Sequence, residues 1–161
     1  MRYASRFGFY ASNGKCDPSE LAAFERSVPG GRLPEDYREF LLEWNGGGFP
    51  DIVSFPLLDE EDEFGMTNEL SGLFDPTNQL DLRKVSTSYG FRSTVPLSYI
   101  IIGGGVGWNS LCISLDGPDR GHVFYWDPGE PWLEHPPTTQ FLRPVAGCFR
   151  DFWNALVVDE D

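Results

Sequence analysis

The segment 33–48 constrains the fold most, because it predicts one helix with both of its ends defined. It opens on Leu33-Pro34-Glu35-Asp36, where proline suits a first turn and the carboxylates complement the positive end of a helix. Four apolar residues then recur at helical spacing and form one face: Tyr37, Phe40, Leu41 and Trp44. Asn45-Gly46-Gly47-Gly48 ends the helix, since these residues reach left-handed conformations at little cost.

A second helix is expected before this segment and a third near the end of the chain. The first of these has Asp17 as its N-cap, Pro18 at its first position and Glu20 to complete a capping box. Pro29-Gly30-Gly31 stops it. The last helix is expected over about Val145–Val157, because its bulky apolar residues cluster on one side: Phe149, Phe152, Trp153 and Leu156.

The residues between these helices favour strands. Ile52–Leu58 is one candidate, with Pro56 indicating an edge or an interruption, and Val95–Ile102 is another. Trp108–Leu115 and His122–Trp126 form a hairpin pattern with a longer loop. The ambiguous stretch 73–88 includes a candidate short helix at Asn78–Val85. Helices at both ends of a meandering sheet predict an α+β fold, and 161 residues suit a single domain over 1–161.

The charge balance narrows the class of partner. Asp and Glu number 25 against 12 Lys and Arg, which gives a formal net charge of -13. A negative surface repels phosphate backbones and anionic headgroups, so nucleic acid and membrane are poor partners. It attracts basic proteins and speeds their encounter. The alternative reading is that the acidity only maintains solubility.

Asp59, Glu60, Glu61, Asp62 and Glu63 form an uninterrupted acidic run. Such a run repels itself, so a solvated loop or the start of a helix is expected. It fails as a calcium-binding EF-hand loop, because Phe64 replaces the required glycine and Leu70 the terminal glutamate. Three readings stay open: a plain loop, a weak surface cation site and a docking site for a basic partner.

The residues give no sign of a reactive or metal-binding centre. The three cysteines, Cys16, Cys112 and Cys148, are odd in number and well separated, which predicts reduced thiols in a cytoplasmic protein. His122 and His135 have no partner at zinc-like spacing. Neither signal-peptide, phosphate-loop nor G-x-S-x-G patterns occur, so no catalytic, metal or cofactor-binding residues are predicted.

The five tryptophans divide into core and surface candidates. Trp44 and Trp153 fall on apolar helix faces, which favours core packing. Trp126 also favours the core, because both faces of its strand carry large side chains. Trp108 and Trp132 lie at a strand end or in a loop, where an exposed indole can anchor a partner.

Four segments of the sequence, taken in order, form a recognisable set: Leu33–Leu41 with Trp44-Asn45-Gly46-Gly47, Gly105–Asp116, Gly121–Asp127, and Phe149-Arg150-Asp151-Phe152 with Leu156. This set resembles the SUKH superfamily, which includes the regulators of yeast cell-wall synthesis. The similarity spans about residues 17–156, and Cys148 replaces the serine usual before the last helix. Agreement among several local patterns makes the resemblance more specific than any single one.

The resemblance implies an α+β fold whose mixed or mainly antiparallel sheet is flanked by an N-terminal helix pair and a C-terminal helix. It implies a binding protein without catalytic residues, and bacterial members resemble immunity proteins that neutralise toxins. The leading hypothesis is therefore a toxin-neutralising protein that docks a basic toxin domain through Asp59 to Glu63, Trp108 and Trp132. The alternatives are a regulatory scaffold with a non-toxin partner and, third, a small-ligand-binding protein or hydrolase.

Overall fold

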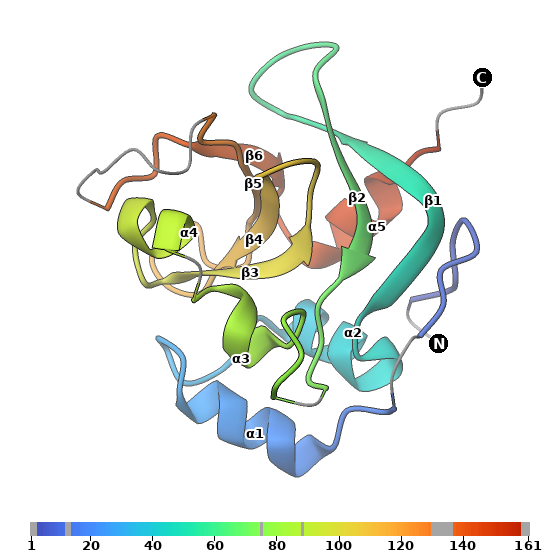
Figure 1. Cartoon of the computed structure of the whole chain (residues 1–161), viewed down its shortest axis with the longest axis vertical. Coiled ribbons are helices and arrows are strands. Elements are labelled where there is room, and N and C mark those ends of the chain that lie inside the picture. Colours follow the sequence, from blue (N-terminus) through green and yellow to red (C-terminus); the bar gives the residue numbers. More distant parts are fainter. Residues whose placement is uncertain (1–2, 12–13, 75, 88, 130–136, 159–161) are drawn as a thin grey trace.

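A computed structural model describes residues 3–11, 14–74, 76–87, 89–129 and 137–158 (Figure 1). In these residues the helices are α1 (Pro18–Arg26), α2 (Glu35–Trp44), α3 (Leu82–Val85), α4 (Tyr89–Thr94) and α5 (Phe149–Ala155). The strands are β1 (Gly47–Pro56), β2 (Phe64–Leu70), β3 (Tyr99–Gly104), β4 (Ser110–Ser114), β5 (Val123–Trp126) and β6 (Leu142–Ala146).

The strands form one sheet in sequence order, and every neighbouring pair is antiparallel. The link between β2 and β3 is narrow, since only Leu70 and Gly103 are paired there. The sheet curls enough for its first and last strands to approach each other. Just after β1, the Leu58 N–H donates to the carbonyl oxygen of Pro144 in β6 at 2.8 Å. The predicted α+β fold with a mainly antiparallel sheet and flanking helices is confirmed.

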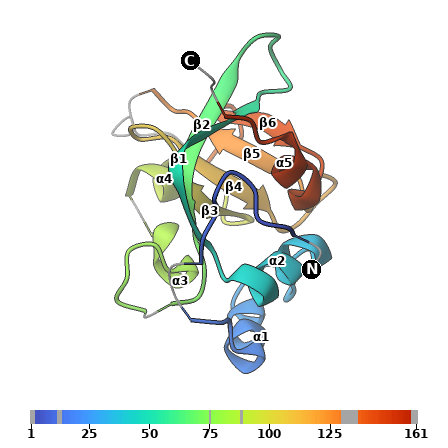
Figure 2. The ribbon, with the colours of Figure 1, turned by 90° about the vertical axis from the view of Figure 1, so that its right-hand side faces the viewer.

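The concave side of the sheet holds the larger core, which α2, α5 and the N-terminal segment cover (Figure 2). Its centre is aromatic: the ring centroids of Phe40 and Phe149 are 4.6 Å apart, and those of Phe40 and Trp153 are 5.4 Å apart. Tyr3 is fully buried against these rings, so residues ahead of α1 belong to the core. Burying large aromatic groups in this way dominates the stability of a domain of this size.

A smaller apolar cluster covers the other side of the sheet. Phe91 packs edge-on against Trp126, with ring centroids 5.4 Å apart. Neighbouring β5 residues therefore serve different clusters, Tyr125 the larger core and Trp126 the smaller one. This confirms the prediction that both faces of this strand are covered and that Trp126 is a core residue, only 3% exposed.

The two predicted N-terminal helices are confirmed, with Asp17 as the N-cap of α1 and Asn45 at the C-terminal end of α2. The Asp17 side chain accepts a hydrogen bond from the Ser19 N–H at the start of α1. Asn45 ends α2 in the left-handed conformation, with a φ of 54°. Asp36, in the first turn of α2, also accepts a hydrogen bond from the Arg150 N–H at 3.0 Å, which joins α2 to the start of α5.

Other predicted boundaries are wrong, because tertiary pairing decides them. The last helix begins at Phe149 instead of Val145, since residues 142–146 pair with β5 as β6. Strand β1 begins at Gly47, five residues before the predicted start at Ile52. The first predicted strand of the second half begins at Tyr99, and the short helix at Asn78–Val85 shortens to α3. β2 and α4 were not predicted.

Cys148 occupies the N-cap of α5, where its thiol accepts a hydrogen bond from the Asp151 N–H at 3.4 Å. Sulfur is a weak acceptor, whereas a serine hydroxyl is among the best N-caps. We expect Cys148→Ser to raise the free energy of unfolding by about 0.5–1 kcal/mol, measured by urea denaturation. Cys148→Ala is the matched control and should lower it; equal stability of the two variants would contradict this role of the side chain.

Candidate functional site

The acidic run lies at the tip of the β1–β2 hairpin and not at the start of a helix. The strands pair up to Pro56 and Phe64, which leaves residues 57–63 to reverse the chain. The Leu57 N–H donates to the Glu63 carbonyl oxygen at 2.9 Å and closes the loop. Asp62 has a φ of 65°, a conformation that aspartate tolerates better than most residues. The hairpin projects from the body of the molecule (Figure 1).

All five acidic side chains of this loop are exposed. Arg143 of β6 contacts the base of the loop, with nitrogen–oxygen distances of 3.2 Å to Asp59 and 3.5 Å to Glu60. Its hydrogen bond to Asp59 raises the pKa of Arg143, so this cation stays charged. One arginine does not neutralise five acids, and Glu61 and Asp62, which are not among its ion-pair partners, keep the tip negative.

Two exposed apolar residues flank the acids. The exposed fraction is 64% for Leu58 and 52% for Phe64, which are large values for such side chains. Acidic residues around apolar anchors resemble the polar rim and apolar centre of protein–protein interfaces. We call residues 58–64 the acidic tip.

The apolar flanks were not predicted from the sequence, because β2 was not predicted. That strand turns Gly65 and Thr67 inward, and neither is a typical core residue. Gly65 is required there: a β-carbon at this position would lie 2.3 Å from the Phe55 ring on the paired strand. The sequence signal for β2 is the pairing of an aromatic residue, Phe55, with a glycine, Gly65. This signal is recognisable only once the register of the two strands is known.

Trp108 lies in the turn between β3 and β4. The Gly105 N–H donates to the Asn109 carbonyl oxygen at 3.0 Å, and Gly107 has a φ of 64°. This tight turn presents Trp108 with 63% of its surface exposed, beside Val106 with 46% exposed. The β3–β4 turn and the acidic tip lie toward the same end of the molecule (Figures 1 and 2). Trp132, the other predicted anchor, lies outside the described residues.

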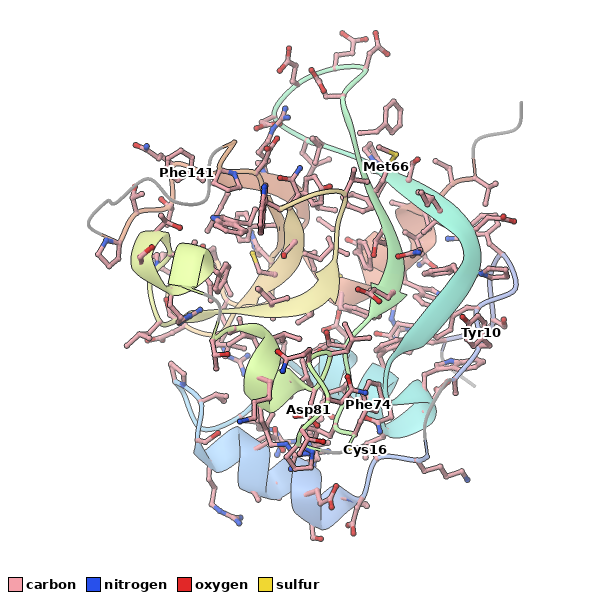
Figure 3. The ribbon with its side chains drawn as sticks, viewed as in Figure 1. Tyr10, Cys16, Met66, Phe74, Asp81 and Phe141 are labelled. Atoms are coloured by element: carbon pink, nitrogen blue, oxygen red, sulfur yellow. The ribbon has the colours of Figure 1, made fainter. Side chains whose placement is uncertain are left out.

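The opposite end of the molecule differs in character. Figure 3 shows Met66 of β2 toward the hairpin end, whereas Cys16, Phe74 and Asp81 lie near α1 and α3. Asp81 is fully buried and binds Arg83 at 2.7 Å. Burial opposes its ionisation, but hydrogen bonds from Arg83 and from backbone N–H groups outweigh burial and hold the pKa of Asp81 below its usual value. The Asp81 carboxylate therefore stabilises the chain around it, by accepting hydrogen bonds from the N–H groups of Phe74 and Arg83.

The thiols are poor nucleophiles in this fold. Burial raises the pKa of Cys16 to about 11, and full burial also raises the pKa of Cys112. Both stay protonated near neutral pH, and a thiol needs deprotonation to react. His122 is exposed and stacks on Phe124, with ring centroids 6.4 Å apart. His135 lies outside the described residues.

Two negative findings apply to the described residues alone. Within the five described ranges, no three His, Cys, Asp or Glu side chains are grouped so that they could hold a metal ion. Over the same ranges, every helix is too short or too polar to cross a bilayer.

The sequence of this chain matches a known protein family. The model of the SMI1/KNR4 family (SUKH-1) matches residues 15–155. The chain belongs to this family. The SUKH-1 match includes the acidic tip and Trp108, so both lie inside the family domain. The match confirms the resemblance to the SUKH superfamily that the helix signature and the later strand motifs indicated.

A similar protein is the SPbeta prophage-derived uncharacterized protein YokK of Bacillus subtilis (strain 168). The two are 26% identical over 153 residues, which covers 86% of this SUKH-1 chain and 73% of the relative. No solved structure matches the chain.

Proposed function

We propose that this SUKH-1 chain is an immunity protein that binds a basic toxin domain and blocks it by occupying its surface. The acidic tip, with Trp108 and Val106, is the docking surface. In this proposal the chain catalyses no reaction, and it acts in the cytoplasm, where such a toxin would act. Trp132 stays a predicted contact.

The acidic tip carries this proposal. It combines exposed carboxylates with two exposed apolar side chains, Leu58 and Phe64, on a hairpin that stands away from the core. Carboxylates accelerate encounter with a basic partner, and apolar anchors then slow dissociation. Nucleic-acid-processing toxins need basic surfaces to bind their substrate, so the same surface would recognise an acidic competitor.

Family membership supports a binding role but leaves the partner open. A regulatory scaffold could use the same surface for a basic partner that is no toxin. Survival of cells distinguishes the two functions, since only an immunity protein protects a host from a toxin.

We expect a gene beside this one to encode the toxin domain, and the test is co-expression of that domain with this chain. The wild-type chain should restore growth. Trp108→Ala should weaken binding of the toxin domain about tenfold, because an exposed indole at an interface centre is a typical hot spot. Isothermal titration calorimetry measures the affinity.

Leu97→Ala is the matched control, because Leu97 is also exposed, at 72%, but lies on the loop before β3. It should leave affinity within about twofold. Failure of the wild-type chain to protect would contradict the immunity function. If the wild-type chain protects cells but Trp108→Ala binds the toxin domain as tightly as the wild-type chain does, Trp108 is not part of the docking surface.

A further inference from the structure

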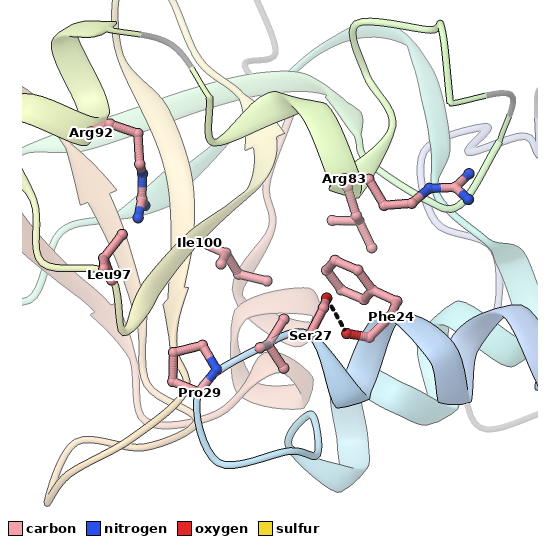
Figure 4. Close-up of a pocket in the computed structure, with 9 residues that line it drawn as sticks. Phe24, Ser27, Pro29, Arg83, Arg92, Leu97 and Ile100 are labelled. Atoms are coloured by element: carbon pink, nitrogen blue, oxygen red, sulfur yellow. Dashed lines mark hydrogen bonds between the residues drawn. The ribbon is translucent and has the colours of Figure 1, made fainter.

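A pocket of about 500 Å³ lies between α1, α3, α4 and the start of β3. Its walls are mostly apolar, and Phe24, Leu82 and Ile100 are nearly buried. Figure 4 shows Ile100 opposite Phe24, with Pro29 and Leu97 toward the side of Arg92. Pockets that hold small molecules typically enclose about 300–1,000 Å³ and have apolar walls with a few polar groups. This pocket has the size and lining of a small-ligand site.

Arg92 supplies the charged group of this pocket. Its guanidinium stacks 4.5 Å from the centroid of the Phe91 ring, and one terminal nitrogen donates to the Tyr99 carbonyl oxygen at 2.6 Å. Its Nε is buried and has no hydrogen-bond partner. The guanidinium is therefore held in place by a backbone carbonyl oxygen and an aromatic ring, neither of which carries a negative charge.

Arg92 also lacks a counter-charge. None of the ion pairs formed by the described residues includes Arg92, although acids outnumber basic residues about two to one in this chain. Burial lowers the pKa of Arg92, which reflects the cost of desolvating its charge. A half-buried cation without a partner is destabilising unless something else provides the opposite charge.

We propose that this pocket binds a small apolar monocarboxylate, with Arg92 as the counter-ion of its carboxylate. An arginine fork matches a carboxylate in shape and charge. The apolar walls suit a hydrocarbon chain or ring. A ligand with one negative charge fits better than a doubly charged phosphate, because the second arginine of the pocket, Arg83, is already paired with Asp81.

The pocket is separate from the proposed docking surface. α1 and α3 lie at the end of the molecule away from the β1–β2 hairpin in both views (Figures 1 and 2). Failure of the pocket assignment would therefore leave the immunity function untouched, and the reverse also holds.

Octanoate and octanamide are the matched probes, since they share a chain and differ in charge. At pH 7 isothermal titration calorimetry should show octanoate binding at least about tenfold more tightly than octanamide. Arg92→Gln should lower octanoate affinity about tenfold or more and leave octanamide affinity unchanged. Arg26→Gln removes an exposed arginine of α1 and should change octanoate affinity less than about twofold.

Arg92→Lys keeps the charge and serves if Arg92→Gln does not fold; it should retain part of the preference for octanoate over octanamide. The assignment is wrong if octanoate fails to bind the wild-type chain at millimolar concentration, or if both probes bind equally. It is also wrong if a capped Leu-Glu-Leu peptide binds through Arg92 and octanoate does not, because the occupant is then a protein segment.

Discussion

Asn45→Ala should lower the free energy of unfolding by about 3–4 kcal/mol. The Asn45 amide donates to the carbonyl oxygens of Leu73 and Gly14 at 2.8 and 3.0 Å, and its oxygen accepts from the Leu73 N–H at 2.7 Å. The side chain is only 2% exposed, so its removal leaves polar backbone groups buried without partners. Alanine would also be strained at a φ of 54°.

Urea denaturation of two variants separates these contributions. Asn45→Gly tolerates the left-handed conformation but loses the same hydrogen bonds, so it should be about 1 kcal/mol less destabilising than Asn45→Ala. Asn68→Ala is the control, because Asn68 is exposed on β2 and should change stability by less than about 0.5 kcal/mol. A loss below about 1 kcal/mol for Asn45→Ala would contradict the anchoring role.

Reversing the charge of Glu61 and Glu63 to lysine should slow association with the toxin domain about 10- to 100-fold at low ionic strength. Both side chains are exposed, so the fold should be preserved. Asp59 and Glu60 are left unchanged because their carboxylates form ion pairs with Arg143. Asp62 is also retained, because its φ is positive. Surface plasmon resonance over a series of salt concentrations measures the association rate.

The matched control reverses Glu20 and Asp116, two exposed acids on α1 and on the β4–β5 turn. Both double variants have the same net charge, so a difference between them reports where the charge lies. The control should associate within about threefold of the wild-type rate, and all rates should converge at high salt. Equal slowing of the two variants would show that net charge, not the acidic tip, drives the encounter.

Local signals explain why the first two helices could be predicted. Asp17 and Pro18 start α1, and Pro34 and Asn45 bound α2, each through interactions within one or two turns. These signals depend on the chain nearby and hold in most tertiary contexts. Trp126 was assigned to the core for a similar reason, since alternation along β5 is itself local.

The missed elements depend on residues far away in the sequence. β6 includes Pro144, and its last two residues, Val145 and Ala146, fell within the predicted last helix, yet the strand pairs with β5. β2 has small inward residues, and its strand character comes from pairing with β1. Strand propensity largely reflects such packing, so a single sequence indicates it weakly.

The candidate site was predicted in part. The acidic run was expected in a loop or at the start of a helix, and the structure shows a loop. Its position at the end of a projecting hairpin could not be predicted without β2. Leu58 and Phe64 become candidates only because the hairpin exposes them. The Arg92 pocket was not predicted, because α1 and the segment from α3 through α4 to β3, which together form it, lie about 55 to 75 residues apart in the sequence.

Hydrogen–deuterium exchange of this chain, free and bound to the toxin domain, tests the docking surface most directly. We expect slower exchange in the bound state at residues 57–64 and 105–109, while exchange in α1 and α3 stays unchanged. Protection confined to α1, α3 or the outer edge of β1, with none at the acidic tip, would contradict it.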